Sequence, residues 1–185
     1  MAKVYDGIDE RLATWLGEQP VFFVATAPRS DAGHVNLSPK GMRGTFAVLA
    51  PDRVAYLDYF GSGAETIAHL RENGRIVLMF CAFAGRPQVV RLHGRGRVLL
   101  PGEPEFGAVR PRLAKQTDHA VRSIIDVQVQ RVSDSCGFAV PQLTYVADRD
   151  VLELANAKKS AEFFDEYART KNATSIDGLP AVPVN

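Results

Sequence analysis

A turn of small and hydroxyl-bearing residues that leads into a short helix is the segment best suited to chemistry. Directly after a strand that ends near Tyr59, the chain reads Gly61, Ser62, Gly63, Ala64, Glu65 and Thr66. The first amide groups of a helix have no partner within it, and the helix dipole adds partial positive charge there. We therefore expect this turn to bind an anion, most simply the phosphate of a cofactor. A plain connecting turn is the alternative.

Two side chains at the start of this helix have opposite effects on such a site. The hydroxyl of Thr66 can donate a hydrogen bond to a phosphate, whereas the carboxylate of Glu65 would repel one if it faced inward. We expect Glu65 to face outward, where an acid in the first turn stabilises the helix dipole.

A second group of polar side chains lies in the run from His34 to Gly41. Lys40 is the natural cation for the same phosphate, because an ammonium on a flexible stem acts as a point charge. Asn36 and Ser38 share one face of the expected strand, since side chains alternate, and both can hydrogen-bond to a ligand. Ordinary loop or surface positions are the alternative for all three.

One arginine on the long segment 88–100 is a further candidate for anion binding. Alternation places Arg91 on the same face as Val89 and His93. A guanidinium fork suits a phosphate or a carboxylate and keeps its charge. An exposed surface arginine is an equally good interpretation. Gly94 and Gly96 in the same segment predict a bulge or a tight bend.

The cysteines and histidines show no spacing typical of a metal site. The four histidines are scattered without HxH or HxxxH spacing, and His69 is expected on the surface of the short helix. Cys81 lies within an apolar strand and should be buried as a small hydrophobic residue. For Cys136, which follows the last strand, we expect a packing role, because the sequence shows no cationic neighbour that would activate its thiol.

Composition restricts the class of protein. With 185 residues, of which 46% are apolar, the chain can bury one substantial core, so a single domain is expected. The net charge of +1 argues against a nucleic-acid-binding surface, which needs a basic excess. The longest apolar stretch, 76–84, is less than half of the roughly 20 residues that a membrane helix needs. Without a signal-like apolar segment near residue 1, we expect a cytoplasmic protein.

The elements that must position these residues are mostly strands. Helical spacing of apolar residues from Ile8 to Leu16 predicts an opening amphipathic helix, and a second, charged helix is expected over 151–171. The segment 104–122 is weakly helical. Strands are expected at 21–27, 34–38, 45–49, 53–59, 76–83, 88–100 and 123–132, joined mainly by hairpins. This pattern predicts a mainly β fold, an antiparallel barrel with helices outside. We expect residues 1–145 to form the barrel domain, and 146–185 to pack on it or on a partner subunit.

The order of these motifs resembles the FMN-binding split barrel of the pyridoxamine 5′-phosphate oxidase family. The resemblance covers roughly residues 10 to 140. It is carried by His34-Val35-Asn36-Leu37-Ser38-Pro39-Lys40-Gly41, Ala55-Tyr56-Leu57-Asp58, the turn Gly61-Ser62-Gly63 with its helix, and Asn73-Gly74-Arg75 before an apolar strand. The segment Ser133 to Gly137 also resembles an uncharacterised bacterial subgroup of that family.

The resemblance implies more than the residues show by themselves. It implies a six-stranded split barrel that binds FMN, and a homodimer with the cofactor at the interface. It further implies that Gln88 lies near the flavin ring, and that Ser135 and Cys136 lie toward the flavin or the substrate. We accordingly expect a flavin-dependent oxidoreductase in which Lys40, Arg91 and the 61–66 turn hold FMN. Its substrate is a small molecule that the sequence does not identify.

The sequence also departs from the family. The oxidase proper ends with an arginine and histidine pair that grips pyridoxal phosphate, and nothing after Gly137 matches it. Oxidation of vitamin B6 is therefore not expected. Two alternatives stay open. One is a reductase using a deazaflavin coenzyme, whose more acidic tail would need the basic residues Arg43, Arg86 and Arg95. The other is a protein that binds flavin or haem without turnover.

Overall fold

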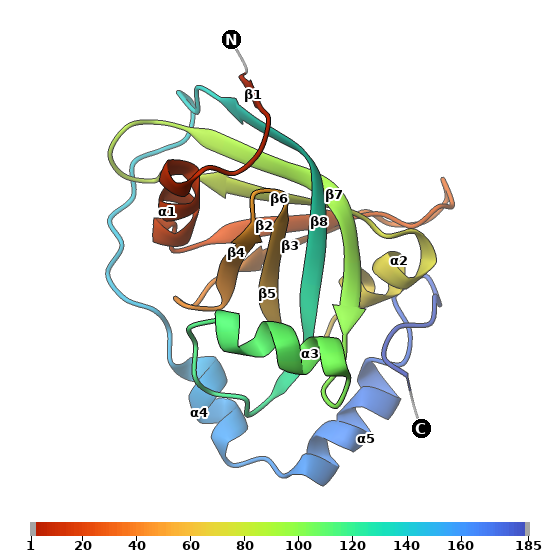
Figure 1. Ribbon diagram of the computed structural model, residues 1–185. Coiled ribbons are helices and arrows are strands. Elements are labelled where there is room, and N and C mark those ends of the chain that lie inside the picture. The colour runs from red at the N-terminus through yellow and green to blue at the C-terminus, as the bar shows by residue number, and fades with distance from the viewer. Residues whose placement is uncertain (1–2, 184–185) are drawn as a thin grey trace.

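The computed structural model describes residues 3–183 and is built around one sheet of eight antiparallel strands (Figure 1). The strands run in the order β3-β2-β6-β7-β8-β5-β4, and β1 pairs with β8. Within the described residues β3 and β4 do not pair with each other, so the curled sheet stays open. Their bounds are β1 Val4–Tyr5, β2 Phe22–Thr26, β3 Asn36–Lys40, β4 Phe46–Ala50, β5 Arg53–Tyr59, β6 Arg75–Cys81, β7 Val89–Leu99 and β8 Val121–Ser135.

Helices flank this sheet on several sides (Figure 1). They are α1 Glu10–Glu18, α2 Glu65–Asn73, α3 Pro104–Val109, the 3-10 turn η1 Arg110–Arg112, α4 Val151–Ala157 and α5 Ala161–Lys171. The expected mainly β fold with flanking helices is confirmed, although the sheet has eight strands rather than six. No helix within residues 3–183 is long and apolar enough to cross a membrane.

β5 is the strand that lies between two hydrophobic clusters. Val54 and Tyr56 belong to the main core, together with the stacked rings of Phe22 and Phe80. On the other face of β5, Ala55 and Leu57 pack with residues of α3, β7 and β8 in a second cluster. Because both faces are covered, every residue from 54 to 58 is buried. A charged side chain near the end of this strand must therefore find its partners inside the protein.

Two elements differ from the expectation. The weakly helical 104–122 segment is helical only as far as residue 112, and the strand expected from 123 begins at Val121. The single helix expected over 151–171 is two helices, because Ser160 adopts an extended conformation and caps α5 by accepting from the amide of Phe163. The bulge expected on the long strand is confirmed, since the pairing of β7 with β8 shifts between His93 and Gly94.

The segments after β8 pack around the outside of the barrel. The chain from 136 to 150 contains no helix or strand and runs along one side to α4 (Figure 1). After α5, the tail docks beside α2, where Arg71 Nη1 donates to the carbonyl of Ala181 at 3.0 Å and Ala181 is fully buried. These contacts place the tail next to the turn that precedes α2.

Candidate functional site

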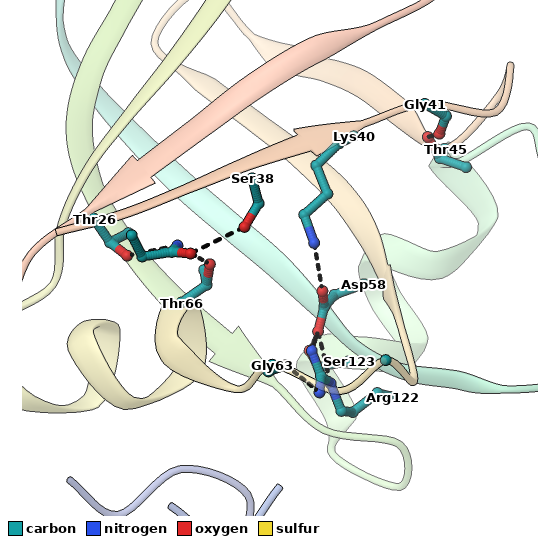
Figure 2. Close-up of polar contacts among 12 residues, drawn as sticks. Thr26, Ser38, Lys40, Gly41, Thr45, Asp58, Gly63, Thr66, Arg122 and Ser123 are labelled. Atoms are coloured by element: carbon teal, nitrogen blue, oxygen red, sulfur yellow. Dashed lines mark hydrogen bonds and ion pairs between the residues drawn. The ribbon is translucent and has the colours of Figure 1, made fainter. Parts of the chain in front are cut away.

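Lys40, Asp58, Arg122 and Ser123 form a buried polar group at the end of the barrel that carries the 61–66 turn; we call it the Asp58 cluster (Figure 2). Lys40 Nζ lies 3.0 Å from Asp58 Oδ1. Arg122 Nε and Nη2 lie 2.9 and 2.8 Å from Asp58 Oδ2, in a two-pronged contact. Ser123 Oγ donates to the same oxygen at 3.3 Å. The carboxylate, on β5, is thus held by side chains from two other strands, β3 and β8.

The Asp58 cluster carries two positive charges and one negative charge. Asp58 is 1% exposed and Arg122 is 6% exposed, whereas 24% of the Lys40 side chain reaches solvent. Burial raises the pKa of Asp58, but the charges of Lys40 and Arg122 outweigh burial and hold it below its ordinary value. The carboxylate is therefore ionised at neutral pH, and one positive charge remains in excess. Of the two cations, Lys40 is the one that a ligand can reach.

Arg122 connects this cluster to the turn before α2. Its Nη1 donates to the carbonyl of Gly63 at 2.9 Å (Figure 2). The carbonyl of Gly61 accepts from Asn172 Nδ2 at 2.9 Å. Ala64, at the N-cap of α2, provides no side-chain hydrogen bond to the first amides of that helix. The turn is thus anchored by its carbonyl groups, while the start of the helix keeps amide donors that its N-cap leaves unmet.

Glu65 and Thr66 face different neighbours. Glu65 Oε1 accepts from the amide of Ile176 in the tail at 3.3 Å, and Oε2 lies 2.5 Å from where a Cβ at Gly63 would stand. Thr66 is buried, and its hydroxyl accepts from Asn36 Nδ2 at 3.0 Å. The acid therefore lies beside the turn with a tail amide as its partner, and the hydroxyl points toward β3.

A chain of polar contacts extends from β3 to a buried histidine. Ser38 Oγ donates to Asn36 Oδ1 at 3.0 Å, and Asn36 Nδ2 donates to Thr26 Oγ1 at 3.2 Å (Figure 2). Thr26 Oγ1 in turn lies 2.9 Å from His69 Nδ1. The expectation that His69 lies on the surface is wrong, since it is 0% exposed. Burial lowers the pKa of His69, so the ring is neutral.

Lys40 and Arg91 point to opposite faces of the sheet. Lys40 pairs with Phe22, Phe22 with Phe80, and Phe80 with Val90. Paired residues share a face and neighbours along a strand alternate, so Arg91 faces the other way. Its Nη1 donates to Ser135 Oγ at 3.1 Å. One protomer alone does not bring these two cations together, and their joint role in holding a cofactor stays a prediction.

Gln88, Ser135 and Cys136 gather at a different place. They line a cavity of about 890 Å³ beside α1, the β6–β7 connection and the end of β8. Gln88 Nε2 donates to Asp134 at 3.3 Å. Cys136 is exposed, so the packing role expected for it is wrong, whereas Cys81 is buried as expected.

The basic residues proposed for a deazaflavin tail contact different parts of the fold. Arg43 lies over the ring of Tyr145 at 4.6 Å, and Arg86 lines the cavity just described. Arg95 donates to the carbonyl of Asn73 at the end of α2. These three arginines therefore do not form one basic groove within residues 3–183. No group of three metal-ligating side chains occurs within these residues.

Sequence reasoning missed the centre of the Asp58 cluster. The sequence does offer one indication that Asp58 is special, because it is an acid near the end of a mainly apolar strand. No local pattern identifies Arg122 and Ser123 as its partners. Their contacts with Asp58 span more than 60 positions and depend on the pairing of β5 with β8.

The comparisons with known proteins agree on one family. The family model described as pyridoxamine 5′-phosphate oxidase matches residues 8–158. A pyridoxamine 5′-phosphate oxidase family protein of Aspergillus flavus, ustO, is 37% identical over 192 residues, which cover 96% of this chain and 77% of that protein.

Solved structures share the fold at low sequence identity. A variant of HupZ from Group A Streptococcus aligns with a TM-score of 0.52 and 17% identity, over 69% of this chain and 99% of that chain. A proposed 5-nitroimidazole antibiotic resistance protein from Bacteroides thetaiotaomicron aligns with a TM-score of 0.51 and 13% identity, over 72% and 86% of the two chains. At these identities the likeness concerns the fold alone.

Proposed function

Since this chain belongs to the pyridoxamine 5′-phosphate oxidase family, we propose that it is a flavin-dependent oxidoreductase that binds FMN. The observation that carries the proposal is the excess positive charge of the Asp58 cluster, tied to the turn before α2. A flavin supplies the hydride or electron transfer when bound. The residues of this chain bind the cofactor and orient it.

The residues near the turn fit the phosphate of FMN in charge and in donor type. Lys40 offers a partly exposed ammonium, and the start of α2 offers amide donors. Asn36 and Ser38 lie on the same strand face as Lys40 and add amide and hydroxyl groups. Glu65 is the one group that opposes an anion, and its contact with the tail amide of Ile176 partly satisfies its charge.

Replacing Lys40 with alanine tests this assignment. The loss of one charge-assisted hydrogen bond is expected to weaken FMN binding by about 1–3 kcal/mol, or about 5- to 150-fold in Kd. The measurement is a titration of flavin-free protein with FMN, followed by flavin fluorescence. Lys115→Ala is a matched control, because Lys115 also pairs with an acid, at 2.7 Å from Glu153, and its side chain is 23% exposed.

Equal FMN affinity for Lys40→Ala and Lys115→Ala would remove Lys40 from the site. Binding of a deazaflavin coenzyme in place of FMN would contradict the cofactor assignment. The purified holoprotein should also pass electrons from reduced flavin to an added acceptor. A bound flavin that exchanges no electrons with any acceptor would identify a binding protein rather than an enzyme.

We further propose a homodimer, formed through the face of the sheet that carries Arg91. Leu37 is 65% exposed there, and the half-buried side chains of Phe23 and Met79 lie on the same face of the sheet, one cross-strand row away. Exposed apolar surface of this kind marks protein interfaces. A site shared by two protomers is also the arrangement in which Arg91 could take part in holding the cofactor.

Placing a charge on this face should weaken the dimer. Leu37→Asp is expected to raise the dimer dissociation constant by at least about tenfold, because an unpaired carboxylate would be buried. Sedimentation over a range of protein concentrations measures the change. Leu154→Asp on α4, at a residue 62% exposed, is the control and should leave the dimer intact. A monomer in the unaltered protein, or equal behaviour of both variants, contradicts this interface.

A further inference from the structure

The cavity beside α1 is large enough to hold a small molecule. Its volume of about 890 Å³ lies within the range of about 300–1,000 Å³ that is typical of ligand sites. Three regions far apart in the sequence surround it: residues 3–19 with one face of α1, the β6–β7 connection, and the end of β8 with the chain that leaves it. None of the residues of the Asp58 cluster lines it.

Aromatic rings line the cavity from two sides. Trp15 lines the cavity from α1, and Phe138, which is 82% exposed, lines it from the chain after β8. Gly137 lets that chain turn close to β7, because its φ is 67° and a Cβ there would stand 3.0 Å from the amide nitrogen of Gln88. A half-buried ring such as Trp15 and an exposed one such as Phe138, both lining a cavity, favour a planar ligand that can stack on them.

Two arginines that line the cavity make no hydrogen bond or ion pair with the described residues. Arg11 lies one helical turn before Trp15 on α1, and Arg86 lies on the β6–β7 connection. Both are exposed, and neither guanidinium makes a hydrogen bond or ion pair with a residue between 3 and 183. An unpaired guanidinium at the mouth of a cavity offers a planar fork that matches a carboxylate.

Asp134, one of the acids that line the cavity, accepts hydrogen bonds from uncharged donors. Asp134 accepts from the hydroxyl of Tyr5 at 2.6 Å and from the amide of Lys3 at 2.9 Å, besides the amide of Gln88. The hydrogen bond to Asp134 raises the pKa of Tyr5, so that hydroxyl stays a donor at neutral pH. The ammonium of Lys3 lies 4.6 Å from the ring centroid of Tyr5, and its charge helps to lower the pKa of Asp134, so Lys3 acts mainly on that acid.

One further charged side chain lines the cavity. Glu18 is the second acid lining the cavity, and it is exposed on α1 one turn beyond Trp15. The lining therefore has three cations, Lys3, Arg11 and Arg86, against two acids, an excess of one positive charge.

We propose that this cavity binds a small aromatic carboxylate, with its ring against Trp15 and Phe138 and its carboxylate toward Arg11 and Arg86. None of the residues proposed to hold the phosphate of FMN lines this cavity, so the two assignments can be tested separately. That such a ligand is the substrate of the redox reaction rests on the proposed function, and on the presence of Gln88, Ser135 and Cys136 in the same lining.

The single tryptophan of the chain makes this proposal directly measurable. Trp15 is the only tryptophan, so its fluorescence reports on the cavity alone. Benzoate is the probe, with benzyl alcohol as the uncharged control and acetate as the control without a ring. Benzoate is expected to change the fluorescence of Trp15 saturably, with an affinity at least about tenfold higher than either control, because only benzoate satisfies both the rings and the arginines.

Variants separate the cavity from the flavin site. The double change Arg11→Gln and Arg86→Gln is expected to weaken benzoate binding at least about tenfold and to leave FMN affinity unchanged. Arg149→Gln, an exposed arginine between β8 and α4, is the control and should bind benzoate normally. Lys40→Ala should lose FMN affinity but keep benzoate affinity, so failure of one proposal does not look like failure of the other.

Three results would overturn the aromatic carboxylate site. These are the absence of a saturable benzoate signal, equal affinity for benzoate and benzyl alcohol, and competition between FMN and benzoate for the same protein. The last result would assign the cavity to the cofactor. Calorimetry on Trp15→Phe provides a readout that does not rely on fluorescence, and it should show benzoate binding retained, because phenylalanine keeps an aromatic wall.

Discussion

Replacing Asp58 with asparagine is expected to lower the free energy of unfolding by about 3–5 kcal/mol. The change removes the only negative charge of the cluster and leaves Lys40 and the buried Arg122 facing each other without a counter-ion. A buried charge that has lost its partner is costly, because neither water nor another group replaces the contact. Chemical denaturation of the flavin-free protein measures the loss.

Asp126 offers a matched control within the same pair of strands. It also binds two arginines, Arg53 and Arg97, and is itself buried. Its arginine side chains are 37% and 54% exposed, so water can solvate them when the acid is removed. Asp126→Asn should therefore cost clearly less than Asp58→Asn and should leave FMN affinity unchanged. Similar losses of stability in the two variants would show that the Asp58 cluster is not a desolvated charge group.

Arg122→Met is expected to destabilise the protein by about 3 kcal/mol and to make it more sensitive to acid. In the unaltered protein the folded-state pKa of Asp58 lies below its unfolded value, which is about 3.9. Its contribution to stability is therefore fully present above that unfolded value and is lost as the pH falls through the lower folded value.

Without Arg122, burial of Asp58 is opposed by Lys40 alone, so the folded-state pKa of Asp58 should rise. The acid limb of the stability curve should then move to higher pH, which circular dichroism at a fixed urea concentration can follow. Arg97→Met is the matched control, because Asp126 keeps Arg53 and the lost side chain is half exposed. An unchanged acid midpoint in Arg122→Met would contradict the charge balance assigned to this cluster.

The same change should loosen the turn that precedes α2. Arg122 donates to the carbonyl of Gly63, so its removal frees one of the two anchors of the turn. FMN is therefore expected to bind more weakly to Arg122→Met, whereas Arg97→Met should bind FMN normally. The comparison distinguishes a local effect on the turn from a general loss of stability.

Local patterns in the sequence identified most of the fold. Alternation and turn residues placed β5 at Arg53–Tyr59 and the first residue of α2 at Glu65, as the structure has them. The break between α4 and α5 was missed, because the helical pattern of apolar residues continues on both sides of Ser160. In the structure, the boundary between the two helices is set by Ser160, which is extended and caps the start of α5.

The site was predictable to a smaller extent than the fold. Lys40 and the 61–66 turn lie close to each other, as their residue types suggested, but the acid and the arginine that join them come from strands paired over long range. His69 was misplaced because α2 is buried on most of its surface, including every residue from 66 to 70. A polar side chain in a short helix gives no sign of such burial.

The hydrogen bonds of the turn also have a consequence for how the protein is made. The carbonyl of Gly61 and the carboxylate of Glu65 are met by Asn172 and by the amide of Ile176, each 111 positions later in the chain. Synthesis proceeds from the N-terminus, and earlier segments can fold while later ones are still being added. The barrel strands can therefore form on the ribosome well before residues 172–176 emerge. The turn gains its final set of partners only after residues 172–176 have emerged, so it matures later than the barrel strands that it follows.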